Sequence, residues 1–513
     1  MEGIVPTQPR RMHFRNFRRE HALLLVILLV AAFVRLWRLD LMEFKGDEAE
    51  ACRLAYHVFG DPLPDGSNKF PVVGLTASVG VHNPPLFIYL VALPLACWRS
   101  PYAAVIFIAM SNVVAVWLCY CVGRRYFSQF VGLAASALFA LSPWAIVFSR
   151  KIWAQDLLPV FACLFLLVAH RFLVDKKPGM AAWLIVLAGA AIQVHFSALI
   201  LLGVLIFIFI AGRETFRWQW FWVGVAATLV LYAPYLAYLV VSHGADFADL
   251  ANRREQWGGD ASFPLRLLRS IRYALAVSSV DFTQYLTGIS RPCTLVLSLA
   301  TGVACLAGLF WQCFHDRARP LFRARLMLLI WFVLPVLGLV VVGTTPYPHY
   351  FVILYPLPFL GLAVALERMG EKWRGCGTAL LSAILLGYTL FDSVTFRTIT
   401  ERGGGAADYG IAYTYKVAAI DFILKESNGR PFAISSDFDS KAKVPQEYSV
   451  LLWLEMRKYD WSATSSSPAQ VFVLLNTFAS KLSPEGESAV RELRRQDFGP
   501  LAVFVVPLQP KSN

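Results

Sequence analysis

Long apolar runs alternate with short polar loops along most of the chain, from about residue 20 to residue 395. Many of these runs approach 20 residues, the length that crosses the hydrocarbon core of a bilayer as an α-helix. The pattern therefore predicts an all-α polytopic membrane region, residues 21–395, with about eleven spans. The predicted spans are roughly 21–37, 102–122, 130–148, 157–172, 180–194, 196–211, 218–241, 292–314, 326–343, 350–366 and 376–395.

One apolar segment, residues 84–98, does not fit this series. It is short for a span and contains three prolines, Pro84, Pro85 and Pro94. Apolar runs of this length are more often interfacial or re-entrant than spanning. We therefore predict a helix on the membrane surface, within a long loop that extends from residue 38 to residue 101.

The pattern changes after residue 395. Strand-like runs at 471–478 and 501–508 alternate with helix-like segments at 411–427 and 484–496. Mixed strands and helices of this kind predict a small α/β domain, residues 396–513.

The distribution of basic residues orders the spans across the membrane. The formal net charge is +13, and arginine and lysine concentrate in short loops between predicted spans and in residues 1–20. By the positive-inside rule these segments are cytoplasmic, which places the 38–101 loop and the C-terminal domain on the opposite face. The basic charge thus serves topology and anionic headgroups, and it implies membrane lipids and no nucleic acid as partners.

Composition agrees with this class. Charged residues make up 16% of the chain, against roughly 25% in soluble domains. The nine cysteines show no CxxC spacing, so the sequence indicates neither a disulfide framework nor a zinc site.

An acidic cluster stands out in the 38–101 loop. The stretch EFKGDEAEACRLAYHVFG, residues 43–60, carries Glu43, Asp47, Glu48 and Glu50 within eight positions. One interpretation is structural: Asp47 caps a helix and forms a capping box with Glu50. The other is functional: Asp47 is a general base held at the membrane surface.

Further ionisable and polar residues fall on the same predicted face. Each has a structural explanation of its own, such as snorkelling to headgroups or helix capping. Together they place acids and cations around one surface, the layout of a site that receives an anionic lipid headgroup. They are His82, Asn83, Arg150, Lys151, Asp156, His195 and His349.

Four motifs carry a resemblance to a known family. FKGDEA (44–49), NPPL (83–86), SP followed by SR and Asp156 (142–156), and PHYF followed by YP (348–356) occur in this order. This set resembles the bacterial relatives of dolichyl-phosphate-mannose protein mannosyltransferases and of lipid A aminoarabinose transferases. These are integral-membrane glycosyltransferases of the C-type fold, which use polyprenyl-phosphate sugars. The resemblance covers roughly residues 20–370.

The resemblance implies roles for individual residues. It places the catalytic carboxylate at Asp47, with Glu48 beside it, and the second conserved acid at Asp156. The aminoarabinose transferases have Glu–Lys–Pro where this chain has His82–Asn83–Pro84, and a lysine near His195. The resemblance therefore leaves open whether a divalent metal takes part; His82 is the candidate ligand if one does. It also implies a bacterial inner membrane.

The chemistry suits these residue types. A carboxylate deprotonates the acceptor hydroxyl, and cations stabilise the departing phosphate, so one in-line displacement inverts the anomeric centre. We expect Arg150, Lys151, His195 and His349 to bind the donor phosphate, and His82 and Asn83 to lie on a substrate loop. The acceptor could be a glycan, a lipid or a protein.

Two other functions stay open. A transporter or flippase would keep ionisable residues at mid-membrane, whereas here they gather at one face, which favours an enzyme. A non-catalytic scaffold would use the C-terminal domain as its working part.

Overall fold

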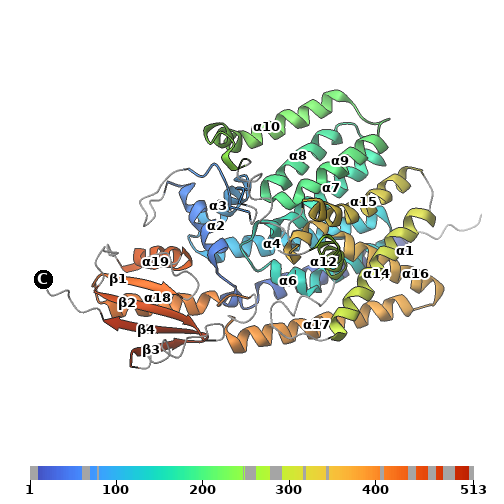
Figure 1. Cartoon of the computed structure of the whole chain (residues 1–513). Coiled ribbons are helices and arrows are strands. Elements are labelled where there is room, and N and C mark those ends of the chain that lie inside the picture. The colour runs from blue at the N-terminus through green and yellow to red at the C-terminus, as the bar shows by residue number, and fades with distance from the viewer. Residues whose placement is uncertain are drawn as a thin grey trace, which may run out of the picture.

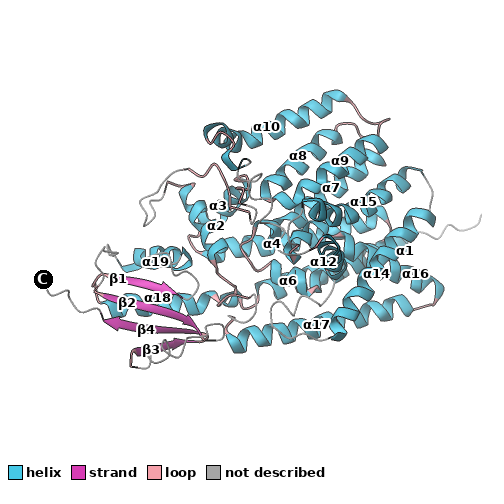
Figure 2. Ribbon diagram, viewed as in Figure 1, coloured by secondary structure: helices cyan, strands magenta, loops and turns pink. Residues whose placement is uncertain are grey.

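The computed structural model describes residues 10–60, 70–77, 80–246, 248, 262–277, 292–315, 319–342, 346–404, 409–436, 446–459, 469–477 and 492–507. Helices form the larger part, and four strands lie together at one end of the molecule (Figure 2).

The helical region consists of α-helices and short 3-10 helices. The α-helices are α1 (Arg10–Leu36), α2 (Gly46–His57), α3 (Leu86–Cys97), α4 (Pro101–Tyr126), α5 (Gln129–Leu141), α6 (Pro143–Phe148), α7 (Leu158–Leu173), α8 (Met180–Val194), α9 (Ile200–Ala211), α10 (Trp218–Val241), α12 (Phe263–Ala276), α14 (Pro292–His315), α15 (Arg319–Val342), α16 (Leu357–Lys372) and α17 (Cys376–Arg402). The 3-10 helices are η1 (Leu39–Leu41), η2 (Ala154–Leu157), η3 (Phe196–Leu199) and η4 (Pro348–Leu354).

The chain is an integral, multi-pass membrane protein. Within the described residues, six helical segments are long and apolar enough to cross a membrane, and η4 with α16, bent by 62°, makes a seventh. These seven match predicted spans. The other four predictions fall on α1, whose apolar stretch has charges at both ends, and on three shorter helical segments at 129–141, 180–194 and 196–211.

The predicted span 130–148 is wrong in one respect, because the structure breaks it into α5 and α6. Ser142 lies between the two helices, and Pro143 occupies the first turn of α6. Proline has no N–H to continue the hydrogen bonding of α5, but it is well suited to begin a helix. The 84–98 segment forms the short helix α3, which packs against α2 and α4.

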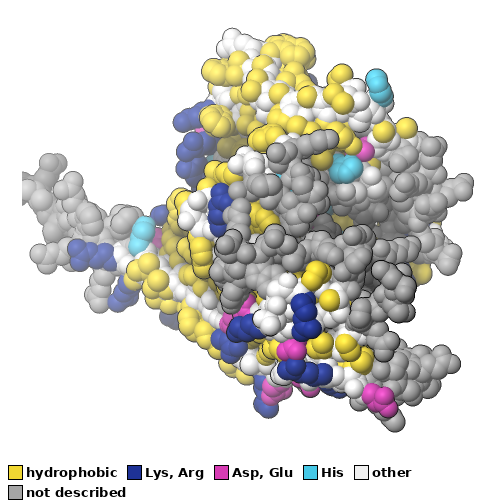
Figure 3. All heavy atoms as spheres, turned by 90° about the vertical axis from the view of Figure 1, so that its left-hand side faces the viewer, with side chains coloured by type: hydrophobic (Ala, Val, Ile, Leu, Met, Phe, Trp, Pro, Cys, Tyr) yellow, Lys and Arg dark blue, Asp and Glu magenta, His cyan; other side chains and the backbone are white. Residues whose placement is uncertain are grey.

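Apolar side chains cover the outside of several helices. Along α10, Trp222, Val230 and Val240 are largely exposed. Such a surface is unfavourable in water and is normal against lipid. Seen from the end that carries the C-terminal domain, hydrophobic side chains cover much of the upper surface, a basic group lies at its left edge, and acidic and basic side chains gather lower down (Figure 3).

Glycines allow two helix pairs to approach closely. A Cβ atom on Gly123 of α4 would lie 2.7 Å from the Cα atom of Gly132 on α5. A Cβ atom on Gly308 of α14 would lie 2.2 Å from the carbonyl oxygen of Gly361 on α16. Small residues at such crossings let membrane helices pack backbone to backbone.

The C-terminal domain contains α18 (Tyr413–Ser427), α19 (Gln446–Tyr459) and the strands β1 (Phe432–Ser436), β2 (Gln470–Asn476), β3 (Arg494–Phe498) and β4 (Leu501–Pro507). The strand order is β1-β2-β4-β3. The strands β1 and β2 are parallel, and the pairs β2–β4 and β4–β3 are antiparallel. The domain lies beside α2 and the end of α17 (Figure 1).

The predictions for this domain are confirmed for α18, β2 and β4. The predicted helix 484–496 is wrong at its end, because residues 494–498 form β3; its residues 484–491 lie outside the described part. Here Arg494, Arg495 and Asp497 are exposed on an edge strand, where charges are favourable. The helix α17 also continues to Arg402, past its predicted end at residue 395.

Candidate active site

The acidic stretch is held at the start of α2. Lys45 is the N-cap residue, and its backbone N–H donates to the Glu48 carboxylate at 3.0 Å. The predicted capping box of Asp47 with Glu50 is therefore wrong, because the helix begins before Asp47 and Glu48, not Glu50, accepts the N-cap N–H. Glu50 pairs with Arg53 at 2.5 Å instead. This leaves the Asp47 side chain exposed in the first helical turn.

Glu43 is the centre of a buried ionic group. Its fully buried carboxylate pairs with the buried Lys151 and, at 3.0 Å, with the partly exposed Lys45. The backbone N–H of Gly410 donates to it at 2.6 Å. Burial alone would raise the pKa of Glu43, but the two lysines and the Gly410 N–H lower it to about 2. Sequence reasoning assigned no role to Glu43, Lys45 or Gly410.

Glu48 has the opposite electrostatic environment. It is fully buried, and its Oε1 atom makes no hydrogen bond with the described residues. Burial, reinforced by the negative charge of Glu43, raises the pKa of Glu48 to about 7. Asp47 is open to solvent on one side, yet the protein around it limits hydration and raises its pKa, against the opposing effect of Lys45.

Asp156 approaches the same group from η2, directly before α7. Its backbone carbonyl accepts a hydrogen bond of 2.8 Å from the Asn112 side chain. Both carboxylate oxygens are buried and make no hydrogen bond with the described part of the chain. The carboxylate interacts electrostatically with Lys151, Glu48 and Glu43. The structure thus brings together all three acids that the sequence predicts as catalytic.

Aromatic rings and histidines surround Lys151. Its ammonium lies 4.2 Å from the ring centroid of Trp153, an edge-to-face neighbour of His349 at 5.3 Å. Tyr350 contacts both His349, at 4.5 Å, and His195, at 6.4 Å between centroids. Trp153 and Tyr350 thus connect Lys151 with both predicted histidines.

His195 is neutral at pH 7. Burial lowers its pKa to about 4. Its Nδ1 atom accepts the backbone N–H of Ser197 at 3.2 Å, which places the imidazole proton on Nε2. At this position His195 is a hydrogen-bond donor, and it supplies no positive charge.

Comparisons with known proteins relate this arrangement to a fold. Residues 82–238 match the profile of the dolichyl-phosphate-mannose-protein mannosyltransferase family. No curated protein matches the chain significantly. The solved structure of ArnT from Cupriavidus metallidurans, bound to undecaprenyl phosphate, superposes with a TM-score of 0.50 at 15% identity, over 94% of this chain and 97% of that one. The chain has the C-type glycosyltransferase fold.

A second solved protein is similar at a lower level. The oligosaccharyltransferase of Archaeoglobus fulgidus in its apo form gives a TM-score of 0.48 at 13% identity, over 84% of this chain and 64% of that one. The same protein tethered to an acceptor peptide gives a TM-score of 0.49 at 13% identity, over 84% of this chain and 63% of that one. The superposition on ArnT confirms the C-type fold expected from the motifs, and residues 82–238 match one of the expected families.

Arg150, a predicted phosphate-binding residue, has a guanidinium that is engaged with the main chain. Its buried guanidinium donates to four carbonyl oxygens at the end of α1 and stacks on Phe396, 4.8 Å from the ring centroid. The carbonyls belong to Val34, Arg35, Trp37 and Arg38, at 3.3, 3.1, 2.5 and 2.8 Å. Burial lowers the pKa of Arg150 to about 10, so the side chain stays charged at pH 7.

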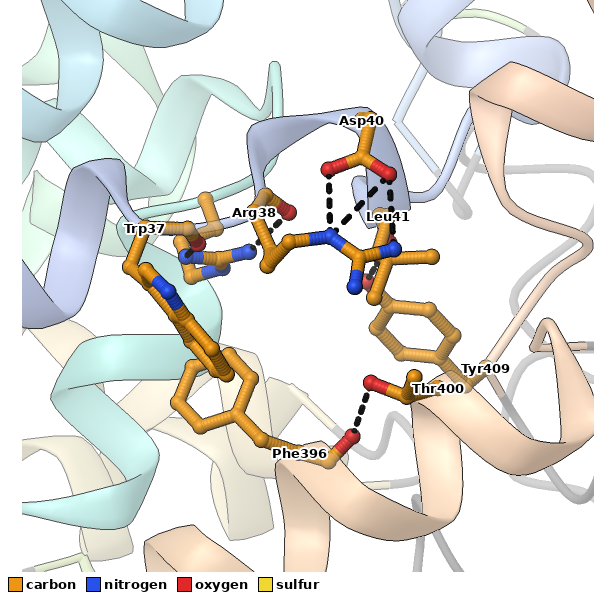
Figure 4. A network of polar contacts seen from close by, with 8 residues as sticks. Trp37, Arg38, Asp40, Leu41, Phe396, Thr400 and Tyr409 are labelled. Atoms are coloured by element: carbon orange, nitrogen blue, oxygen red, sulfur yellow. Dashed lines mark hydrogen bonds and ion pairs between the residues drawn. The ribbon is translucent and has the colours of Figure 1, made fainter.

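The guanidinium of Arg150 is directed at the main chain and at the ring of Phe396. Figure 4 shows Trp37 meeting Phe396 edge to face and Arg38 gripping the Asp40 carboxylate. The nitrogens Nη1 and Nη2 of Arg150 both point at main-chain oxygens, so a phosphate would have to replace those bonds. A helix C-terminus favours such a cation because its carbonyls lack partners in the helix.

His82 and Asn83 lie on a loop that contacts other elements. The Nδ1 atom of His82 lies 3.0 Å from Asp246, whose other oxygen accepts from Tyr238 at 2.8 Å. Asn83 is buried and accepts the Phe196 N–H at 3.2 Å, which links the loop to the segment after His195. Asn83 thus holds the loop against the segment that carries His195.

The residues described here do not form a metal site. Across the described ranges, no three His, Cys, Asp or Glu side chains are grouped so that they could hold a metal ion. Among the described residues, the carboxylate in contact with His82 is that of Asp246.

Proposed function

We propose that the chain is an inverting glycosyltransferase, which moves a sugar from a polyprenyl-phosphate donor to an acceptor hydroxyl at the extracytoplasmic face of a bacterial inner membrane. The observation that carries the proposal is the exposed carboxylate of Asp47 beside the buried group of Glu43, Lys45 and Lys151. The C-type fold, the match to a mannosyltransferase family and the undecaprenyl phosphate bound to ArnT support it.

Asp47 is the proposed general base. It is exposed, so an acceptor hydroxyl can reach it, and its raised pKa makes it a stronger base than an ordinary aspartate. Asp47 takes the hydroxyl proton as the acceptor oxygen bonds to the anomeric carbon. The bond between that carbon and the phosphate oxygen breaks on the opposite side, which inverts the anomeric configuration.

The leaving phosphate takes both electrons of the broken bond and needs positive charge. Lys45 and Lys151 are the two cations of this group, where they face the Glu43 carboxylate and interact electrostatically with Asp47. We assign the phosphate to Lys151 and Lys45, with the neutral His195 as a hydrogen-bond donor and His349 beside it. In this region, away from bulk water, charged contacts are stronger than in solution.

Glu48 and Asp156 support this group from the buried side. Glu48 fixes the start of α2 through the Lys45 N–H, and so the position of Asp47. Asp156 offers two carboxylate oxygens without described partners, which could accept hydrogen bonds from sugar hydroxyls. The sugar is a hexose or pentose in this proposal, and the acceptor is a glycan, lipid or protein.

The test replaces Asp47 by Asn, which keeps the size of the side chain and removes the proton acceptor. Mass spectrometry of cellular glycoconjugates should show a sugar-sized mass that requires the wild-type chain. At equal expression, Asp47→Asn should reduce its rate of formation by about 10²-fold or more. The matched control, Glu50→Gln on the same helix, should leave it near the wild-type level. Equal glycoconjugates with wild type and Asp47→Asn would reject this role.

A further inference from the structure

The first segment of the C-terminal domain lies directly against the acidic stretch. Residues 409–416 run antiparallel to residues 41–44, with an isolated bridge between Glu43 and Ala412. Four hydrogen bonds join the two segments. They are Tyr409 OH to the Leu41 carbonyl at 2.7 Å, Gly410 N–H to the Glu43 carboxylate at 2.6 Å, Tyr413 N–H to the Met42 carbonyl at 2.8 Å and Lys416 Nζ to the Phe44 carbonyl at 2.5 Å.

Among the described residues, Gly410 is the main-chain donor to the Glu43 carboxylate. The other two donors to this carboxylate, Lys45 and Lys151, are flexible four-carbon side chains. The Gly410 N–H belongs to the main chain and shares the Oε2 atom of Glu43 with Lys45, while Oε1 accepts from Lys151. Fixing Oε2 therefore fixes the orientation of the whole carboxylate, and with it the position of Lys151.

Tyr409 holds Lys151 from a second direction. The Lys151 ammonium lies 5.7 Å from the ring centroid of Tyr409 and 4.2 Å from that of Trp153. Tyr409 is buried, and its hydroxyl donates to Leu41, so its ring is anchored at the far end. The two rings and Glu43 leave Lys151 little freedom to move.

The absence of a side chain at position 410 also matters. A Cβ atom on Gly410 would lie 2.6 Å from Cε and 2.8 Å from Cγ of Lys45. Any larger residue must displace the Lys45 side chain, although alanine would keep the N–H donor. Alanine and proline at this position thus separate two effects: both displace Lys45, and only proline removes the hydrogen bond to Glu43.

From these contacts we infer that the C-terminal domain is a working part of the site, in which Tyr409 and Gly410 position the Glu43–Lys151 ion pair to receive the donor phosphate. Both are positioning residues that act through Glu43 and Lys151. The inference rests on the proposed function, because it assigns the donor phosphate to Lys151.

The test measures the affinity of the purified full chain in lipid nanodiscs for undecaprenyl phosphate. Gly410→Pro should weaken binding by roughly 10- to 100-fold, because small displacements of a positioning group have effects of this size. Gly410→Ala should weaken it less. Glu426→Gln, which removes a surface ion pair with Arg494 in the same domain, is the control and should bind as the wild type does.

A double-mutant cycle distinguishes positioning from general damage. If Gly410 acts through Glu43, proline should weaken binding in the wild-type background and have little further effect in Glu43→Gln. The same loss in both backgrounds would overturn the inference. If Gly410→Pro does not fold, Tyr409→Leu, which removes both the ring and the hydroxyl, enters the same cycle.

The outcome also separates this inference from the proposed function. A wild type that binds undecaprenyl phosphate, shows the expected coupling and transfers no sugar would reject glycosyl transfer and retain the positioning role. A wild type that transfers sugar without coupling between Gly410 and Glu43 would retain the function and reject the inference. Failure of the wild type to bind undecaprenyl phosphate would overturn it as well.

Discussion

Asp47 and Glu48 are neighbours in the sequence, and the first turn of α2 separates their environments. The Asp47 side chain faces solvent, whereas Glu48 is turned inward and caps the helix through Lys45. The raised pKa of Glu48, about 7, comes from burial and from the charge of Glu43. One carboxylate is therefore available to a substrate, and the other makes the structure sensitive to pH.

This sensitivity gives a prediction for Glu48→Gln. Between pH 4.5 and 7 the folded chain keeps the Glu48 proton and the unfolded chain releases it, so stability falls as pH rises through this window. Above pH 7 the ionised Glu48 lowers the free energy of unfolding by about 3 kcal/mol. Glutamine removes this effect, so the variant should gain stability relative to the wild type on going from pH 5 to pH 8.

The measurement is the thermal unfolding midpoint in detergent at both pH values. Burial lowers the pKa of His195 to about 4, which makes stability rise with pH between 4 and 6.5, so only the difference between variant and wild type reports on Glu48. Glu50→Gln, at a partly buried position of α2 paired with Arg53, should show no such difference. A constant gap between Glu48→Gln and the wild type would contradict a raised pKa.

At the scale of elements, helix ends are held by arginines from elsewhere in the chain. Arg150 donates to the last carbonyls of α1. Arg35, within α1, donates to Ala140 and Phe139 at the end of α5, at 2.8 and 3.2 Å. These bonds satisfy carbonyls that α1 and α5 cannot satisfy internally, and they tie the two helices and the loop after α6 into one unit.

A structural role for Arg150 makes a clear prediction. Arg150→Lys cannot span four carbonyls with one ammonium, so it should lower stability by about 3 kcal/mol. The folded variant should bind undecaprenyl phosphate with an affinity within about twofold of the wild type. If Arg150 contacted the phosphate directly, the substitution would reduce this affinity by more. Thermal unfolding and nanodisc binding check the two parts. Arg397→Lys, on the exposed face of α17, is the control.

At the scale of the molecule, segments far apart in the sequence meet at one end. The Glu43 loop, the segment after α6 and the start of the C-terminal domain form the candidate site together. The helix α19 packs against α2 through Trp453 and Tyr56, with ring centroids 4.7 Å apart. All of these must therefore lie on the same side of the membrane.

The basic loops predict that this side is extracytoplasmic. In a chain freed of its native cysteines, a membrane-impermeant reagent added to intact cells should label Ser67→Cys and Ser466→Cys. It should not label Arg319→Cys, which belongs to a predicted cytoplasmic loop. A residue 466 protected in intact cells and labelled only after lysis would reverse the topology.

Much of the fold was predictable because lipid imposes a simple rule on sequence. Spans such as α4 and α10 are nearly uninterrupted apolar runs, and charge bias orders them. The break at Ser142 and the edge strand β3 were not predicted. In the first case one proline divides a run that is apolar throughout; in the second, three charged residues are as compatible with a helix as with an exposed strand.

The site was predictable in part. Loop polarity was enough to place Asp47, Glu48, Asp156, His195 and His349 on one face, and the structure groups them. The sequence could not predict which groups bond to Glu43. Gly410 is 367 positions away, and a backbone donor leaves no pattern in the sequence. The sequence did not show that the donors of Arg150 bond to main-chain carbonyls, because an arginine near a membrane surface suits a phosphate and a helix end equally well.

The capping of α1 by Arg150 has a consequence for biogenesis. Arg38 and Arg150 are 112 positions apart, so α1 leaves the ribosome long before its cap exists. At ordinary rates of synthesis this interval is roughly 6–20 s. During that time the terminal carbonyls of α1 must be satisfied by water or headgroups, and Arg35 has not yet met α5. The first helix can therefore enter the membrane early, but it reaches its final packed position only after the segment that follows α6 has been synthesised.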